Sequence, residues 1–370
     1  MNTEQIYTIV NSVTSQAIGS QALTIVDAQG LISLGNTVLS SSTNTEAFLD
    51  TLAQRIGRTI YRYREYNNKF RDMIVSDMEW GAILQKIRVE MPQAEADQMY
   101  TLTDGQSIDP YVVSKPKAHQ KLFVTRTPYQ FKITIQRETL KEAFLSPEAM
   151  GSFISLVFGE VRNAIELALE SLGRITLVTA MAEIRQNTQK IDLVTDYNAD
   201  TGSTLTAATA LYNKDFLNYA IYRINHVVDM IQDMSTMFCD GSLPTFTNKE
   251  NMRIRVLSSF QRRLETVTQY AAFHEQFVDI DGSYSVVNYW QAEQSPSSVT
   301  VKRPSDGNTF SDDNIVAEIN DRDSFGIYQM SEYVSTTPIN SAGLYFNQFW
   351  HEKQGRFIDT SENMVIFTLD

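Results

Sequence analysis

The sequence predicts an α+β fold, and three parts of the chain indicate it. A long apolar helix is predicted to begin at Ser146-Pro147 and to continue to about residue 185, because large apolar side chains recur at three- and four-residue steps. A strand-loop-strand segment over residues 78–136 comes directly before it. A region of mixed helices and strands follows over 188–330. A chain that combines a long helix, a β-hairpin and a mixed region without a regular repeat is typical of an α+β protein.

Composition limits the classes of function. The chain has 370 residues, of which 42% are hydrophobic, which is enough for a sizeable core and two or three domains. Its net charge of −13 disfavours nucleic-acid binding as a primary role but permits a wall that encloses nucleic acid without adhering to it. Cys239 is the only cysteine, so we expect a small buried apolar residue rather than a disulfide or a cysteine metal site. The chain has no basic signal-peptide region at its start and no membrane-spanning apolar run, which fits folding in a reducing cytoplasm.

Residues 1–77 are predicted to form an N-terminal arm and a leading helix. Residues 1–45 are small and polar, with one short helical stripe and a loop at Ser40–Asn44, so a flexible leader and an interaction arm both remain open. A helix is predicted from Thr45, followed by a strand at Tyr61–Tyr66, where rings and charges alternate.

Residues 78–136 are predicted to form an extended hairpin. Ile87, Val89 and Met91 alternate with charged residues in the first arm. The second arm combines Leu122–Arg126 with Tyr129–Ile135, and a long loop separates the two arms. A two-stranded ribbon is marginal alone in water, so we expect it to lie on a neighbouring subunit.

The long helix has a clear start signal and an unusual length. Ser146 can cap the helix, and Pro147 suits the first helical position. The predicted rod is roughly 60 Å long at 1.5 Å per residue, which is too long for an ordinary enzyme core and suits a protein that tiles against copies of itself. Gly151, Gly159 and Gly173 lower its intrinsic stability, so packing must compensate or the helix bends.

The rest of the chain is predicted to form a compact α/β unit followed by returning strands. The predicted elements are a helix from Phe216, a strand at Arg253–Leu257, a helix at Phe260–Ala272, a strand at Ser283–Trp290, a polar loop at Ser295–Asn314, and strands within 325–370.

The search for catalytic motifs finds none that is complete. His274-Glu275 and His351-Glu352 lack the second histidine of a zinc-protease helix. Gly30 and Gly35 have phosphate-loop spacing, but Asn36 stands where a lysine is needed. We therefore predict no enzymatic activity, no cofactor and no metal. A cytoplasmic hydrolase that uses carboxylates such as Asp321 and Asp323 is kept as a remote alternative.

The order of the parts resembles that of a known family. An extended loop at Gly81–Ile135, a spine helix at Ser146–Arg185 and a strand re-entry at Ile319–Tyr328 resemble the tailed-bacteriophage major capsid proteins with the HK97-like fold, in particular the small podovirus type. The resemblance implies an N-terminal arm and leading helix (1–77), an extended loop (78–136), a peripheral domain with the spine helix (137–199), an axial domain (200–324) and returning peripheral strands (325–370).

The resemblance also implies partners. The chain is expected to form hexamers and pentamers of an icosahedral shell that encloses double-stranded DNA, with the extended loop over an adjacent subunit. A separate scaffolding protein and a portal protein are implied, no membrane is involved, and the product is a virion capsid assembled in the host cytoplasm. An encapsulin-type compartment, which encloses enzymes, is the main alternative. Candidate intersubunit contacts are Trp80, Arg88, Glu90, Lys115, Lys117, Arg126, Tyr129, Arg137, Glu160, Arg253 and Arg255.

Overall fold

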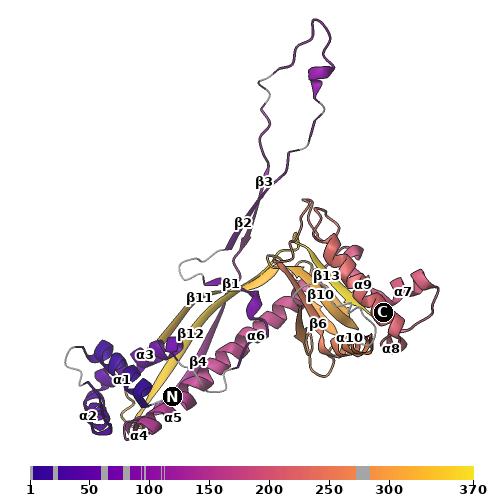
Figure 1. The fold of residues 1–370 in the computed structure, drawn as a ribbon. Helices are drawn as coiled ribbons and strands as arrows, with labels where there is room; N and C mark the ends of the chain where they lie inside the picture. Colours follow the sequence, from indigo (N-terminus) through magenta and orange to yellow (C-terminus); the bar gives the residue numbers. More distant parts are fainter. Residues whose placement is uncertain are drawn as a thin grey trace.

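The protein consists of two bodies and a projecting ribbon. The computed structural model describes residues 3–19, 24–59, 66–77, 84–92, 94–95, 97–109, 111, 113–271 and 284–370. Figure 1 shows an elongated body near the N terminus, a compact body that carries the C terminus, and a two-stranded ribbon that extends away from both. Helix α6 runs from the elongated body toward the compact one.

Three helices form the N-terminal part of the elongated body: α1 (Thr3–Ile18), α2 (Ala28–Leu39) and α3 (Ser42–Thr59). Asp27 caps α2, because its Oδ1 accepts a hydrogen bond from the backbone N–H of Gly30 at 2.7 Å. The buried side chains of these helices join one core, and they include Ile6, Val10, Val13, Leu31, Leu34, Val38, Phe48 and Leu52. The loop predicted at Ser40–Asn44 is shorter than predicted: only Ser40 and Ser41 lie between α2 and α3. Helix α3 already begins at Ser42, since burial of its apolar face outweighs the low helix propensity of its polar first turn.

The long helix is built from consecutive segments after a short helix α4 (Arg137–Ala143): α5 (Pro147–Phe153), a π-helical turn η3 (Ile154–Phe158) and α6 (Gly159–Ala182). The predicted cap is confirmed, because Ser146 Oγ accepts from the N–H of Ala149 at 3.1 Å and Pro147 is the first helical residue. Val161 and Leu169 lie in the core of the elongated body, whereas Leu177 and Met181 lie in that of the compact body. The helix therefore joins the two cores. Among the described residues, neither it nor any other helix could span a bilayer.

A four-stranded sheet packs on this helix, in the order β1 (Ile74–Asp77), β11 (Phe325–Thr336), β12 (Tyr345–Ile358) and β4 (Thr127–Gln136). Strand β1 is parallel to β11, and the other two pairs are antiparallel. Val334 lies opposite Trp350, and both are buried in the core with the helices. Tyr333 and His351, one step along, are exposed. Because successive side chains alternate between faces, one face of the sheet is covered and the other is open.

The second arm of the predicted hairpin divides between two structures. Only Ala118–Phe123 pairs with the first arm, whereas Thr127–Gln136 pairs with β12 in the four-stranded sheet. The prediction that Tyr129–Ile135 completes the hairpin is therefore wrong. The side chains of Phe131 and Ile133 pack against the core of the elongated body, and this burial draws the segment into that sheet.

The compact body contains a five-stranded sheet in the order β5 (Lys190–Asp192), β13 (Met364–Thr368), β10 (Ile315–Asp321), β6 (Met252–Leu257) and β7 (Tyr284–Val287). Its helices in the described part of the chain are α7 (Leu193–Thr201), α8 (Ala207–Ala210), α9 (Lys214–Met230) and α10 (Ser258–Ala271). The helix predicted from Phe216 and the strand predicted at Arg253–Leu257 are confirmed. The predicted loop Ser295–Asn314 instead contains a hairpin of β8 (Val299–Lys302) and β9 (Thr309–Asp312).

The chain passes from the elongated body to the compact body between β12 and β13. Strands β11 and β12 return to the elongated sheet as predicted, but β13 lies between β5 and β10 in the compact body. Every residue of β13 is buried. A continuously apolar strand needs cover on both faces, and an interior position in the compact sheet supplies it. The segment predicted as returning strands of one domain, 325–370, therefore contributes to both bodies.

Candidate intersubunit site at the ribbon

The ribbon consists of β2 (Leu84–Val89) and β3 (Ala118–Phe123), which pair from Leu84 opposite Phe123 to Val89 opposite Ala118. Its tip covers residues 90–117, and the N–H of Glu90 donates to the carbonyl of Lys117 at 2.9 Å at the start of the tip. Figure 1 shows that the tip lies far from both bodies. The outer part of the ribbon is therefore available for contact with a neighbouring molecule.

The two faces of the ribbon have opposite character. Directly opposed residues share a face, so Lys86 and Lys121 lie on one side, whereas Ile87 and Val89 lie on the other. The charged side points toward the protein's own loop between β12 and β13. The other side carries Ile87, Val89, Ala118 and Leu122, which we call the apolar ribbon face, together with Gln85 and Gln120. It is open: Ile87 is 59% exposed and Val89 is 55% exposed. The charges face inward and the aliphatic side chains face outward, which is the reverse of what a ribbon surrounded by water would adopt.

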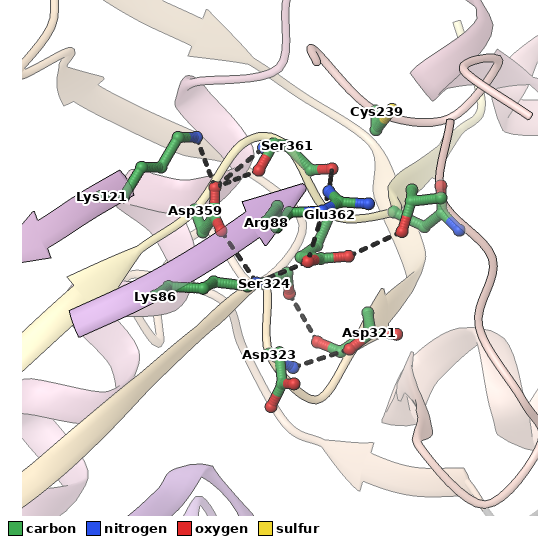
Figure 2. Close-up of polar contacts among 12 residues, drawn as sticks. Lys86, Arg88, Lys121, Cys239, Asp321, Asp323, Ser324, Asp359, Ser361 and Glu362 are labelled. Atoms are coloured by element: carbon green, nitrogen blue, oxygen red, sulfur yellow. Dashed lines mark hydrogen bonds and ion pairs between the residues drawn. The ribbon is translucent and has the colours of Figure 1, made fainter. Parts of the chain in front are cut away.

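Asp359 is the acceptor around which the ribbon is anchored. Its Oδ2 lies 2.9 Å from Nζ of Lys86, and its Oδ1 accepts from Nζ of Lys121 at 2.6 Å and from Oγ of Ser361 at 2.6 Å. Burial alone would raise the pKa of Asp359, but Lys86, Lys121 and Ser361 together lower it to about 2. Asp359 is therefore an anion at neutral pH, held between one cation from each strand (Figure 2).

Arg88 and Glu362 extend this anchor to the compact body. Arg88 donates to the carbonyl oxygens of Ser361 and Pro244, each at 3.2 Å, and its Nη1 lies 3.6 Å from Glu362. Glu362 also accepts from Lys86 and from Thr245 Oγ1, the latter at 2.8 Å. Figure 2 shows Arg88, Ser361 and Glu362 converging from the ribbon and the loop. We call the set Lys86, Arg88, Lys121, Asp359 and Glu362 the ribbon root.

An apolar contact completes the base of the ribbon. Tyr328 and Phe357 are buried, and Leu84 and Phe123 pack against them. The rings of Phe123 and Phe357 are 5.5 Å apart, and the Tyr328 hydroxyl donates to the carbonyl of Thr125 at 2.7 Å. The ribbon is therefore held at its base by packing as well as by charge, while the rest of its length extends outward.

The tip carries apolar side chains that lack cover. Tyr100 is 83% exposed, Tyr111 is 86% exposed and Val113 is 76% exposed. Met99, Leu102 and Ile108 are also exposed. A concentration of exposed apolar residues on a projecting element marks an interaction surface.

The predicted contact residues are spread over the molecule. Trp80 lies outside the described residues. Arg88 belongs to the ribbon root, Glu90 pairs with His119 at 2.8 Å, and Arg137 donates to the carbonyl of Leu39 at 3.2 Å. Lys115, Lys117, Arg126 and Glu160 are exposed, and Tyr129 is half-buried on β4. Arg88, Glu90, Lys115 and Lys117 belong to the ribbon and its tip, whereas Arg137 and Glu160 lie on helices α4 and α6.

Two predicted contacts lie inside the subunit. Arg255 is fully buried, and its guanidinium contacts Glu318 at 3.2 Å and Asn320 at 2.9 Å. It also pairs with Asp72, as does Arg253 at 3.5 Å. Arg255 is therefore wrong as a surface contact: the cluster attaches the short helix η1 (Arg71–Met73) to the compact sheet.

Of the two carboxylates of the hydrolase alternative, that of Asp321 serves the fold. Asp321 is buried; its Oδ2 accepts from Thr247 Oγ1 at 2.6 Å and its Oδ1 accepts from the N–H of Asp323 at 2.8 Å. These are the contacts of a turn between β10 and β11. Cys239 is buried, as predicted.

The acceptors of the ribbon root are not predictable from the sequence. Asp359 and Glu362 occupy the loop between β12 and β13, far along the chain from Lys86, and no local pattern joins them. The alternation around Ile87 and Val89 identified the strand, but which side faces the protein depends on that distant loop.

The fold with its projecting ribbon is the HK97-like fold of tailed-phage capsid structures. The capsid structure of Staphylococcus phage Andhra matches with a TM-score of 0.54 and 11% identity, covering 85% of this chain and 87% of that chain. A chain from the structure of the head fiber and inner core protein of native bacteriophage P68 matches with a TM-score of 0.50 and 12% identity, over 85% of this chain and 87% of that one.

The family follows from the sequence comparisons. Residues 6–368 match the family model of the Phi29-like phage major capsid protein, and the chain belongs to this family. It is 22% identical over 365 residues to the major capsid protein of Bacillus phage PZA, a match that covers 98% of this chain and 72% of that protein. The protein is thus a structural component of a phage capsid and not an enzyme.

Proposed function

We propose that copies of this chain form the hexamers and pentamers of an icosahedral shell, with the ribbon of each copy lying over the elongated body of the next. The observation that carries the proposal is the reversed polarity of the ribbon. Its charges are neutralised within the subunit at the ribbon root, while Ile87 and Val89 remain open on the apolar ribbon face. Covering this aliphatic surface with a neighbouring copy would stabilise the assembly by about 25 cal/mol for each Å² of apolar surface removed from water.

The two bodies then take different places in the shell. The elongated body corresponds to a peripheral domain and the compact body to an axial domain around which copies gather. The spine helix joins the two cores, so a load on one body is transmitted to the other. A contact between unlike surfaces of identical chains closes into rings when its rotation permits, which suits hexamers and pentamers.

The proposed content is double-stranded DNA. The net charge of −13 favours an inner wall past which a phosphate polymer can slide during packaging and release. A scaffolding protein during assembly, a portal protein at one vertex and assembly in the host cytoplasm complete the proposal, and membership of the family supports them.

Sedimentation of the assembled full-length chain tests this function, with analysis of the particle contents. The proposal predicts fast-sedimenting closed shells that protect DNA from nuclease when packaging proteins are present. Particles filled with enzyme cargo would favour a compartment of the encapsulin type. A species no larger than a dimer would contradict both.

A further inference from the structure

A short segment ahead of the ribbon contacts both bodies and the spine helix. Residues 66–77, which we call the strap, contain η1 and β1. Strand β1 pairs with β11 in the elongated sheet, whereas Phe70 and Met73 lie in the core of the compact body. The N–H of Tyr66 donates to Oδ1 of Asn163 on the spine helix at 3.1 Å. Figure 1 shows β1 beside the point where β11 and β12 approach the compact body.

Arg174 of the spine helix lies where these parts meet. Its guanidinium carbon is 5.2 Å from the ring centroid of Phe70, in the strap, and 3.9 Å from that of Tyr289, which follows β7 in the compact body. It also pairs with Glu170 at 2.9 Å and donates to the carbonyl of Tyr289. Gly173 permits the approach of the strap, because an added Cβ would lie 2.9 Å from the Cβ of Phe70. Cation–π attraction to both rings therefore fixes the spine helix, the strap and the compact body together.

Asp72 attaches the strap to the compact sheet through charge. It pairs with Arg255 and, at 3.5 Å, with Arg253, both on β6. The side chains of Arg255 and of its partner Glu318 are 1% and 0% exposed, whereas that of Asp72 is 39% exposed. Asp72 thus stands at the edge of the cluster within reach of water, and the groups behind it are enclosed while the strap is in place.

The closed strap leaves buried polar atoms without partners. Nε of Arg255, Nη1 of Arg253 and Oε1 of Glu318 have no hydrogen-bond partner within the described part of the chain. An unpaired buried polar group costs free energy that contact with water would recover. Lifting the strap would hydrate these atoms, and this gain offsets part of the loss of the Asp72 pairs. The attachment is therefore specific in geometry but weaker than its buried contacts alone would make it.

We infer that the strap is a releasable fastening that sets the angle between the two bodies. While it is closed, Phe70 and Arg174 hold the compact body against the spine helix. When it is released, the bodies stay connected through α6, the turn between β10 and β11 and the loop between β12 and β13. The compact body turns on these links, since hinges are formed by a few residues at the ends of elements.

The fastening acts within one subunit, and its use in assembly rests on the proposed function. A shell that contains both hexamers and pentamers places the same chain in two different surroundings. A strap that opens at a small cost in free energy lets the chain take a different angle in each. Its closed state would define one of these angles in the free subunit.

Energy transfer between two dyes on the full-length, unassembled subunit tests the inference. Ser152→Cys on α5 and Asn218→Cys on α9 carry the dyes, because both positions are exposed and they lie in different bodies. The helix from Ser152 to the end of α6 is roughly 45 Å long at 1.5 Å per residue, a span that suits energy transfer. Cys239 is buried and its burial raises the pKa of its thiol, so labelling of the unmodified chain gives the background. In the labelled parent, one transfer efficiency should dominate.

Two substitutions in the labelled chain release the strap in different ways. Asp72→Asn removes the charge that pairs with the arginines of β6, and a second efficiency should become at least about tenfold more populated, as expected for loss of a hydrogen bond to a charged group. Arg174→Lys keeps the charge but loses the planar group that lies over the two rings, and it should have the same effect. The matched control is Asp196→Asn, since Asp196 is 36% exposed and pairs with Arg223 at 3.0 Å inside the compact body.

Hydrogen exchange of the amides in β10 and β13 shows whether the compact body remains folded in each variant. A single parental efficiency in both release variants, or an equal second population in Asp196→Asn, would overturn the inference. Faster exchange in β10 and β13 together with the second efficiency would also overturn it, because the compact body would then unfold rather than turn. A chain that shows both efficiencies but never forms closed shells would contradict the proposed function and leave the strap assignment in place.

Discussion

The Nζ atom of Lys86 lies 2.9 Å from Oδ2 of Asp359 and so ties the first strand of the ribbon to the loop between β12 and β13. Lys121, on the second strand, reaches the other oxygen of the same carboxylate at 2.6 Å. One buried anion thereby sets the position of both strands. The direction in which the ribbon leaves the subunit depends on this anchor as much as on the apolar contact with Phe357.

Substitution Asp359→Asn is expected to loosen the ribbon. It removes the charge that Lys86 and Lys121 share, and we expect unfolding to become easier by about 1–3 kcal/mol, since both lysines retain some access to water. The measurement is hydrogen exchange of the amides in β2 and β3, which should become faster while exchange in β10 and β13 is unchanged. The matched control is Glu90→Gln, which removes a carboxylate from the exposed part of the ribbon.

The same anchor predicts a response to acid. The pKa of Asp359 is lowered to about 2, so its contribution to stability is complete above its ordinary pKa of about 4. It is lost as the pH falls through about 2, because the folded state must then take up a proton that breaks the anchor. Hydrogen exchange of the ribbon measured between pH 5 and pH 3 should therefore show an intact anchor after correction for intrinsic rates. Loss of protection already near pH 5 would contradict the assigned role.

Glu352 predicts an effect in the opposite direction. Glu352 is buried beneath the spine helix. Burial is the main cause that raises its pKa to about 7, and the Glu332 carboxylate raises it further, whereas Arg162 lowers it. The folded state therefore binds this proton more tightly than the unfolded chain does, and stability from this group falls as the pH rises from about 4.5 to 7. Glu352→Gln should stabilise the subunit at pH 8 by roughly 1–3 kcal/mol and have little effect at pH 4.

Urea unfolding of the wild type and Glu352→Gln at both pH values provides the measurement. Glu332→Gln is the control, because it removes only the neighbouring exposed charge and should give a smaller gain in the same direction. An equal effect of Glu352→Gln at pH 4 and pH 8 would mean that ionisation of Glu352 is not the cause.

Gly355 predicts a steric requirement at the base of the ribbon. A Cβ at this position would overlap the ring of Tyr328, whose hydroxyl holds the carbonyl of Thr125. Gly355→Ala should therefore destabilise the subunit by about 1–3 kcal/mol, measured by the urea midpoint. Gly159→Ala is the matched control: nothing lies within 4 Å of the added Cβ in a helical position, so a gain of about 0.5–1 kcal/mol is expected. A neutral Gly355→Ala would show that the Tyr328 ring can move aside.

The tip predicts a separation of folding from assembly. Replacing Met99–Lys117 by a short Gly-Ser linker removes exposed Tyr100 and Tyr111 and leaves the ribbon root intact. The subunit should remain soluble with an unchanged unfolding temperature, yet closed shells should not appear in electron micrographs. Normal particles from this variant would show that the tip is dispensable.

The sequence predicted the elements that are determined by residues close together in the chain, such as a helix cap or an alternating strand. Ser146 and Pro147 mark the helix start correctly, because a cap depends on residues within one turn. Alternation around Ile87 identified a ribbon strand for the same reason. Thr127–Gln136 pairs with β12, and β13 pairs with β10. Because these pairings depend on burial against segments distant in the chain, the spacing of residues could not predict them.

The candidate site was predicted only in outline. The extended segment was recognised, but Asp359 and Glu362 carry no motif, and Arg255 resembled a surface cation because its partners Glu318 and Asp72 are far away in sequence.

A cryo-electron microscopy reconstruction of the assembled particle would show where the ribbon of each subunit lies. We expect hexamers and pentamers in which residues 84–123 of each subunit extend across the elongated body of a neighbour, with Ile87 and Val89 against the adjoining copy. A reconstruction in which the ribbon lies on its own subunit, with the apolar ribbon face in contact with no other copy, would contradict it.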